Sequence, residues 1–66
     1  MNLFSVIETP ELYVNRARAE KLAGTVREWG YRGRVWVKQD RNEPTDYGFC
    51  VAVYSNNGFE GYAHAL

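Results

Sequence analysis

The sequence predicts a two-layer α+β domain, in which one helix packs on a three- to four-stranded, mostly antiparallel sheet in the order β-α-β-β-β. The first half carries a single apolar stripe of helical period, and the second half carries segments of alternating polarity. Because the chain has 66 residues, residues 1–66 form one small domain.

The first strand and the helix start lie in the first fifteen residues. Residues 3–7 are apolar except for Ser5, which is typical of a strand. The helix has two candidate starts. Thr9-Pro10-Glu11 supplies a hydroxyl cap, a proline at the first helical position and an acid in the first turn, whereas Asn15 is a second candidate cap.

The helix is predicted over residues 15–29, where apolar side chains recur at spacings of three and four. Gly30 follows the last of them, and we expect it to end the helix as a left-handed cap. The stripe consists of Ala19, Leu22, Ala23, Val26 and Trp29.

Three further strands are predicted, at residues 34–39, 47–54 and 59–65. In the first of them, Val35 and Val37 alternate with polar residues and a tryptophan. Residues 40–46 are charged and contain a proline, so we interpret them as a loop.

The turn between the last two strands decides their register. A two-residue Asn57-Gly58 loop would set Val51 opposite His64 and bury the imidazole. A three-residue loop, Asn56-Asn57-Gly58, would keep His64 off the core face, so we predict this loop, closed by glycine in a bulge. The pairs expected from it are Ser55 with Phe59, Val51 with Ala63 and Cys50 with His64.

The predicted core joins the helical stripe to one face of the sheet. The phase of the first strand leaves Leu3 and Phe4 as alternatives for one core position. The predicted members are Leu3 or Phe4, Val6, Leu22, Val26, Trp29, Val35, Val37, Phe49, Val51, Val53 and Ala63.

The other face of the sheet also carries aromatic residues, and a single helix covers only one face. Trp36, Tyr54 and Tyr62 have the parity opposite to the core valines. We therefore predict an exposed aromatic binding surface with a shallow centre of small residues. In the alternative interpretation, these aromatics only cover the sheet, or residues 10–14 fold over them. The predicted partner-binding residues are Trp36, Tyr54, Tyr62, His64, Arg34 and Lys38.

The charges disfavour the usual nucleic-acid binders. Eight basic and eight acidic side chains cancel, whereas phosphate binders carry a basic excess and DNA mimics an acidic one. A single-stranded nucleic-acid binder that stacks bases on Trp36, Tyr54 and Tyr62 stays as the alternative function.

No catalytic or metal site is predicted, and no cofactor. Cys50 and His64 would face each other, but nothing near them supplies an oxyanion hole or a third orienting group. One cysteine and one histidine are too few for a structural zinc site. Asp40, Glu43 and Asp46 lack the alternate spacing of a calcium loop.

We expect a cytoplasmic protein, because a lone cysteine fits a reducing compartment. We also expect no membrane-spanning segment and no membrane partner, because the longest apolar run, residues 49–54, is too short to span a bilayer. The expected function is a non-enzymatic protein-binding module that occludes or tethers a larger host protein, as a homodimer. Its size without catalytic groups is typical of stoichiometric inhibitors and adaptors from phages and mobile elements, with an anti-CRISPR-like or other anti-defence role.

Overall fold

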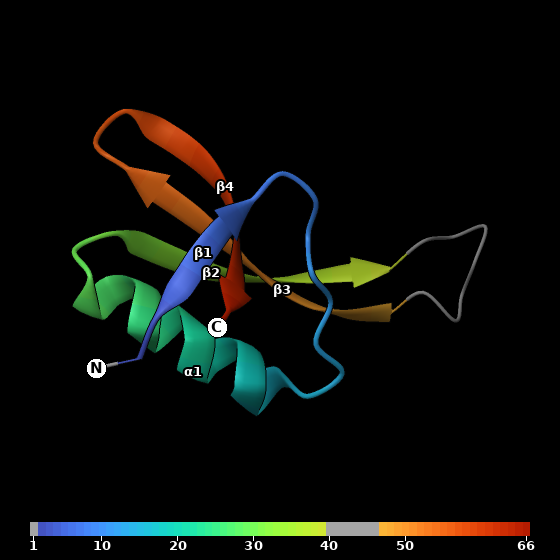
Figure 1. The fold of residues 1–66 in the computed structure, drawn as a ribbon. Coiled ribbons are helices and arrows are strands. Elements are labelled where there is room, and N and C mark those ends of the chain that lie inside the picture. The colour runs from blue at the N-terminus through green and yellow to red at the C-terminus, as the bar shows by residue number, and fades with distance from the viewer. Residues whose placement is uncertain (1, 40–46) are drawn as a thin grey trace.

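The computed structural model describes residues 2–39 and 47–66. One helix and four strands follow one another in the predicted order (Figure 1). The elements are β1 (Phe4–Ile7), α1 (Arg16–Glu28), β2 (Arg32–Gln39), β3 (Tyr47–Ser55) and β4 (Gly58–Ala65).

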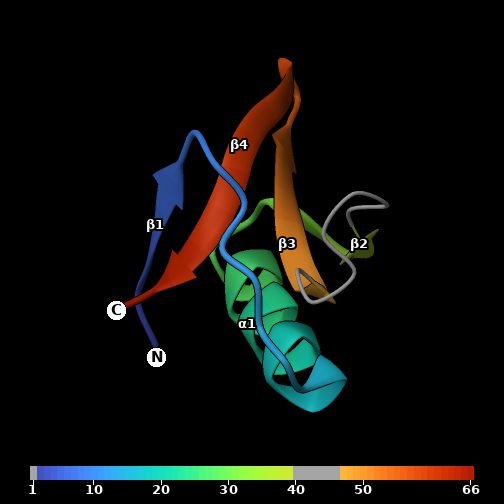
Figure 2. The same cartoon turned by 90° about the vertical axis from the view of Figure 1, so that its right-hand side faces the viewer.

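The four strands form one sheet in the order β1-β4-β3-β2, and every neighbouring pair is antiparallel. Helix α1 lies against one face of this sheet, while β1 and β2 form its two edges (Figures 1 and 2). The predicted two-layer α+β fold is therefore confirmed, with four strands in the sheet.

The helix begins at the second of the two candidate starts. The side-chain oxygen of Asn15 accepts a hydrogen bond from the Ala17 amide at 2.8 Å. The start at residues 9–11 is wrong, because Tyr13 is extended and bridges Phe49. The amide of each of these two residues donates to the carbonyl of the other at 2.8 Å, so this stretch of backbone belongs with the sheet.

The helix ends as predicted. Gly30 has a φ of 87°, and its amide donates to the Arg27 carbonyl at 3.0 Å. The Tyr31 amide donates to the Val26 carbonyl at 3.3 Å. These two bonds form a Schellman motif, which satisfies carbonyls that the helix leaves unpaired.

The core lies between α1 and the facing side of strands β2, β3 and β4. Phe4, and not Leu3, packs against this core, which settles the phase of the first strand. The buried apolar members are Ala19, Leu22, Ala23, Val26, Val51, Val53 and Ala63, with Phe4, Tyr13, Val35 and Phe49 packed around them.

Three predicted core residues are exposed instead: Val6 (44%), Trp29 (45%) and Val37 (60%). The reason is the size of the helix. Its 13 residues span about 20 Å, whereas the nine residues of β3 span about 30 Å. The β2–β3 hairpin extends past the helix (Figure 1), and Val37 is near the end of β2. Val6 lies on an edge strand, and Trp29 is the C-cap of the helix.

The predicted pairing at the turn is wrong, but the register beyond it is right. Asn56 and Asn57 form the connection, so that Ser55 pairs with Gly58 and Tyr54 with Phe59. A bulge then leaves Glu60 without a partner and restores the predicted register at the pairs Val53–Gly61 and Ala52–Tyr62. Gly58 has the positive φ expected of it, 107°.

The close approach of β1 to β4 requires glycine at position 61. Gly61 has a φ of 144°, and a Cβ atom there would lie 2.7 Å from both the Ile7 carbonyl oxygen and Val6 Cγ1. Strand β1 can therefore approach β4 at this point only because the residue has no side chain.

We predict that Gly61→Ala destabilises the fold by about 2–3 kcal/mol, because it combines an unfavourable φ with a backbone clash. Gly24→Ala is the matched control, since a Cβ atom in the middle of α1 meets nothing within 4 Å. It should stabilise the protein by about 0.5–1 kcal/mol. Urea unfolding of the two variants measures both values, and equal effects would contradict the close approach of β1.

Candidate functional site

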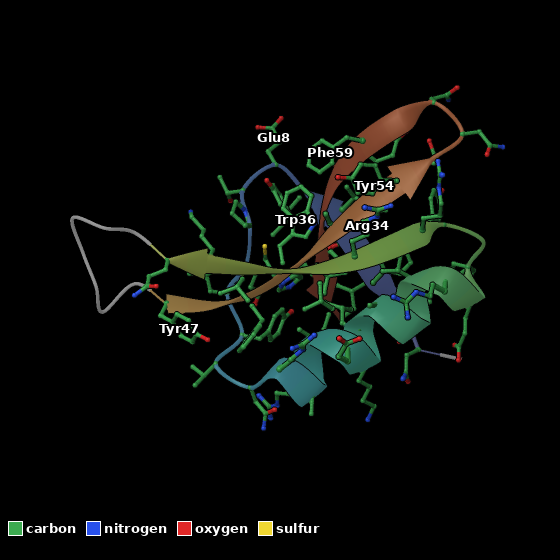
Figure 3. All side chains as sticks on the ribbon, turned by 180° about the vertical axis from the view of Figure 1, so that it is seen from behind. Glu8, Arg34, Trp36, Tyr47, Tyr54 and Phe59 are labelled. Carbon is green, nitrogen blue, oxygen red and sulfur yellow. The ribbon has the colours of Figure 1, made fainter. Side chains whose placement is uncertain are left out.

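Four aromatic side chains gather on the sheet face that is turned away from α1, which we call the open face (Figure 3). They come from three neighbouring strands: Trp36 from β2, Tyr54 from β3, and Phe59 and Tyr62 from β4. We call these four residues the aromatic cluster. The structure thus brings the three predicted aromatic residues together and adds Phe59.

The four rings pack against one another in a closed arrangement. The rings of Trp36 and Phe59 are nearly parallel, with 5° between their planes and 6.4 Å between their centroids. Tyr54 and Tyr62 each present an edge-to-face contact to both of these rings, at centroid distances of 5.3 to 6.4 Å. Such contacts hold the rings in place before any partner arrives.

Phe59 joins the cluster because of the bulge at Glu60. Side chains three positions apart on a regular strand point to opposite faces, yet the extra residue places Phe59 and Tyr62 on the same face. The predicted turn paired Phe59 with Ser55, on the core parity, which is why sequence reasoning missed it. Gly61 inside an otherwise regular strand was the available signal for a bulge.

The cluster is accessible to solvent. Trp36 is 39% exposed and Phe59 is 51% exposed, while Tyr54 and Tyr62 are half-buried. Cys50 and Ala52 share this face but are buried. The predicted shallow centre of small residues is therefore wrong, since these residues form a covered floor.

The open face carries basic side chains along β2. Arg32, Arg34 and Lys38 alternate in sequence with core-facing residues and so share the face of Trp36. The Arg34 guanidinium lies 5.9 Å from the centroid of the Tyr54 ring, within reach of a cation–π interaction. Arg32 donates to the Ser55 carbonyl at 3.1 Å. Among residues 2–39 and 47–66, no carboxylate forms an ion pair with either arginine.

His64 lies outside the aromatic cluster, at the end of the open face that residues 10–14 cover. The Glu11 carboxylate pairs with Nδ1 of His64. Leu12 lies over Gly48, since a Cβ atom at Gly48 would be 2.8 Å from Leu12 Cβ. The alternative in which residues 10–14 fold over the sheet thus holds at this end of the open face only, because the ring faces of the cluster stay exposed.

The predicted pair of Cys50 and His64 is not formed. The β3–β4 ladder ends at Ala52 and Tyr62, because Tyr13 occupies the place beside Phe49 that β4 would otherwise fill. Cys50 is 2% exposed, and its burial raises the pKa of the thiol above the usual value, an effect that the charge of Lys38 partly offsets. A nucleophilic cysteine needs the opposite arrangement, with access and a lowered pKa.

The described part of the chain holds no group of three or more His, Cys, Asp or Glu residues suited to a metal ion. The predicted acidic loop with Asp40, Glu43 and Asp46 lies outside the described residues. In the same described ranges, no helix combines the length and the apolar character needed to cross a bilayer.

The comparisons with known proteins leave the site to be interpreted on its own. No protein-family model, curated protein or solved structure matches the chain. The aromatic cluster and the basic side chains beside it are therefore the features that can indicate a function.

We predict that the Cys50 thiol of the folded protein reacts with a thiol reagent about a hundredfold more slowly than in the unfolded chain, as expected for a small domain stable by about 3 kcal/mol. Raising the pH should increase the rate of the unfolded chain until it levels off near the usual thiol pKa, whereas the rate of the folded protein should continue to rise above that pH, because burial raises the folded pKa. Equal rates with and without denaturant would place Cys50 at the surface.

Proposed function

We propose that this protein is a non-enzymatic binding module that attaches to a larger protein through the aromatic cluster and acts stoichiometrically. The observation that supports this is an exposed set of rings already fixed by their mutual contacts. Tryptophan, tyrosine and arginine are the residue types most enriched where interfaces gain most of their binding energy.

The size of the cluster suits the centre of an interface. The exposed parts of the Trp36 and Phe59 rings offer roughly 150 Å², and their burial contributes about 4 kcal/mol before the costs of association. Because the rings are held in one arrangement, little conformational entropy is lost on binding. Arg34, above the Tyr54 ring, would lie at the polar rim of such an interface.

The biological setting that we propose is a small inhibitor or adaptor of phage or mobile-element type, with an anti-CRISPR-like or other anti-defence role in the cytoplasm. The small size of the chain and the burial of Cys50 support this setting. A homodimer is part of the proposal, because a chain of this length buries a small core and gains stability from association.

The row of cations on β2 favours single-stranded nucleic acid as a second candidate partner. Arg32 and Arg34 are about 6.6 Å apart along the strand, and both flank a face that carries Trp36 and Tyr54. Stacking rings beside a basic track are the usual elements of single-strand binding. The zero net charge of the chain favours the protein partner.

We predict that Phe59→Ser and Trp36→Ala abolish partner binding, because each removes an exposed ring from the centre of the contact. Pulldowns from host lysate with the immobilised protein would measure the loss of the proteins that the unaltered chain retains. Tyr47→Ser is the matched control, since Tyr47 is an exposed aromatic residue packed on Phe49, away from the cluster. Retention of the same proteins by Phe59→Ser would show that another surface binds them.

The nucleic-acid candidate makes a separate prediction. A single-stranded oligonucleotide should quench the fluorescence of Trp36 if bases stack on the cluster, and the affinity should fall steeply with salt. Because Trp29 also fluoresces, the titration is made with a Trp29→Phe variant, and Arg34→Gln should weaken binding. Quenching that does not depend on salt, or no quenching, would remove nucleic acid as a partner.

A further inference from the structure

An apolar hollow lies beside the free edge of β1, on the side of the sheet opposite to the aromatic cluster. Because α1 does not extend over the edge strand (Figure 2), a space of about 320 Å³ remains between β1 and the helix end. The Trp29 indole is held there by a hydrogen bond from its Nε1 to the Asn2 carbonyl, at 2.8 Å. The hollow is lined by Leu3, Phe4, Val6, Trp29 and Tyr31.

The backbone of β1 offers hydrogen-bonding groups at this edge. The Leu3 carbonyl accepts a bond from the Leu66 amide, on the β4 side. Alternate residues of an antiparallel strand direct their backbone groups to the same neighbour. The amide and carbonyl groups of Phe4 and Val6 therefore point away from β4, toward the free edge.

The two edge strands differ in charge, and this difference indicates which of them can pair with the same strand of a second copy. Residues 2–7 carry no charged side chain. The opposite edge, β2, carries Arg32, Arg34 and Lys38, so a second copy docked there would place like charges face to face, which protects an edge from pairing. Of the two sheet edges that the structure describes, β1 is the neutral one, and it lies beside the apolar hollow.

We propose that a second copy of this chain docks on the β1 edge, with the two β1 strands antiparallel and Ser5 on the two-fold axis. This register sets Phe4 of each copy opposite Val6 of the other, so that their free backbone groups pair across the edge. The inference rests on the homodimer part of the proposed function and is independent of what the aromatic cluster binds.

The symmetry of this arrangement closes the hollow. A two-fold axis perpendicular to the sheet keeps both helices on the same face of a continuous eight-stranded sheet. The two hollows then adjoin, and the Trp29 and Tyr31 rings of the two copies fill the space between the helix ends. Both aromatic clusters stay free on the opposite face.

The dimer is expected to be weak. The exposed parts of Leu3, Val6, Trp29 and Tyr31 amount to roughly 300 Å² per copy, less than half of the about 800 Å² per partner in a standard interface. The backbone pairs add to this surface. We therefore expect dissociation in the micromolar range.

Sedimentation of the full chain over a range of concentrations tests the proposal. The unaltered protein should dimerise reversibly, and Val6→Lys should stay monomeric because it places two cations in the shared interface. Val37→Lys is the matched control, since Val37 is an exposed valine at the other edge, and it should dimerise normally. Circular dichroism confirms that each variant is folded; if Val6→Lys is not, a synthetic chain N-methylated at Val6 removes the same pairing.

Cysteine crosslinking tests the register. Ser5→Cys should form an intermolecular disulfide under mild oxidation, because directly opposed residues of this kind lie within disulfide reach. Leu3→Cys should not, since its two copies would lie about 13 Å apart along the strands. The native Cys50 is buried and does not compete.

The outcomes separate this inference from the proposed function. Phe59→Ser should lose the larger partner and keep the dimer. A monomer at all concentrations, an unchanged dimer in folded Val6→Lys, or crosslinking of Leu3→Cys as fast as Ser5→Cys would overturn the β1 interface. Loss of the dimer in Phe59→Ser, with Val6→Lys still dimeric, would move self-association to the open face.

Discussion

The rest of the structure depends on one constraint: a single helix of 13 residues must cover a sheet that is longer and wider than itself. The helix buries the middle of one face, where Val26 packs with Val51 and Val53. Apolar side chains outside the area that the helix covers must be shielded from water in another way. The open face and the β1 edge both lie outside this contact area, and they differ in what covers them.

On the open face the solution is internal packing of aromatic rings. Trp36, Tyr54, Phe59 and Tyr62 cover the buried Cys50 and Ala52 with contacts to one another. These contacts leave two rings accessible, so the same arrangement that completes the fold also provides a rigid surface for a partner. At the other end of the open face, residues 10–14 cover the sheet, with Glu11 on His64 and Leu12 over Gly48.

At the β1 edge no part of the described chain fills the space. The contrast with β2 is informative, because both are edge strands of one antiparallel sheet. Strand β2 carries cations that discourage pairing, whereas β1 is neutral and lies beside apolar rings. A protein with two such different edges can associate through one of them and keep its aromatic cluster available for another partner.

The sequence by itself determined the order of the elements, the helix end at Gly30 and the sharing of one face by Trp36, Tyr54 and Tyr62, because alternation and capping are local properties. Tertiary structure decided the rest. The bridge between Tyr13 and Phe49 excluded the earlier helix start, and the bulge before Gly61 moved Phe59 into the cluster. The exposure of Val6, Trp29 and Val37 followed from the helix being shorter and narrower than the sheet. These outcomes depend on which segments meet in space, and local sequence patterns do not encode such distances.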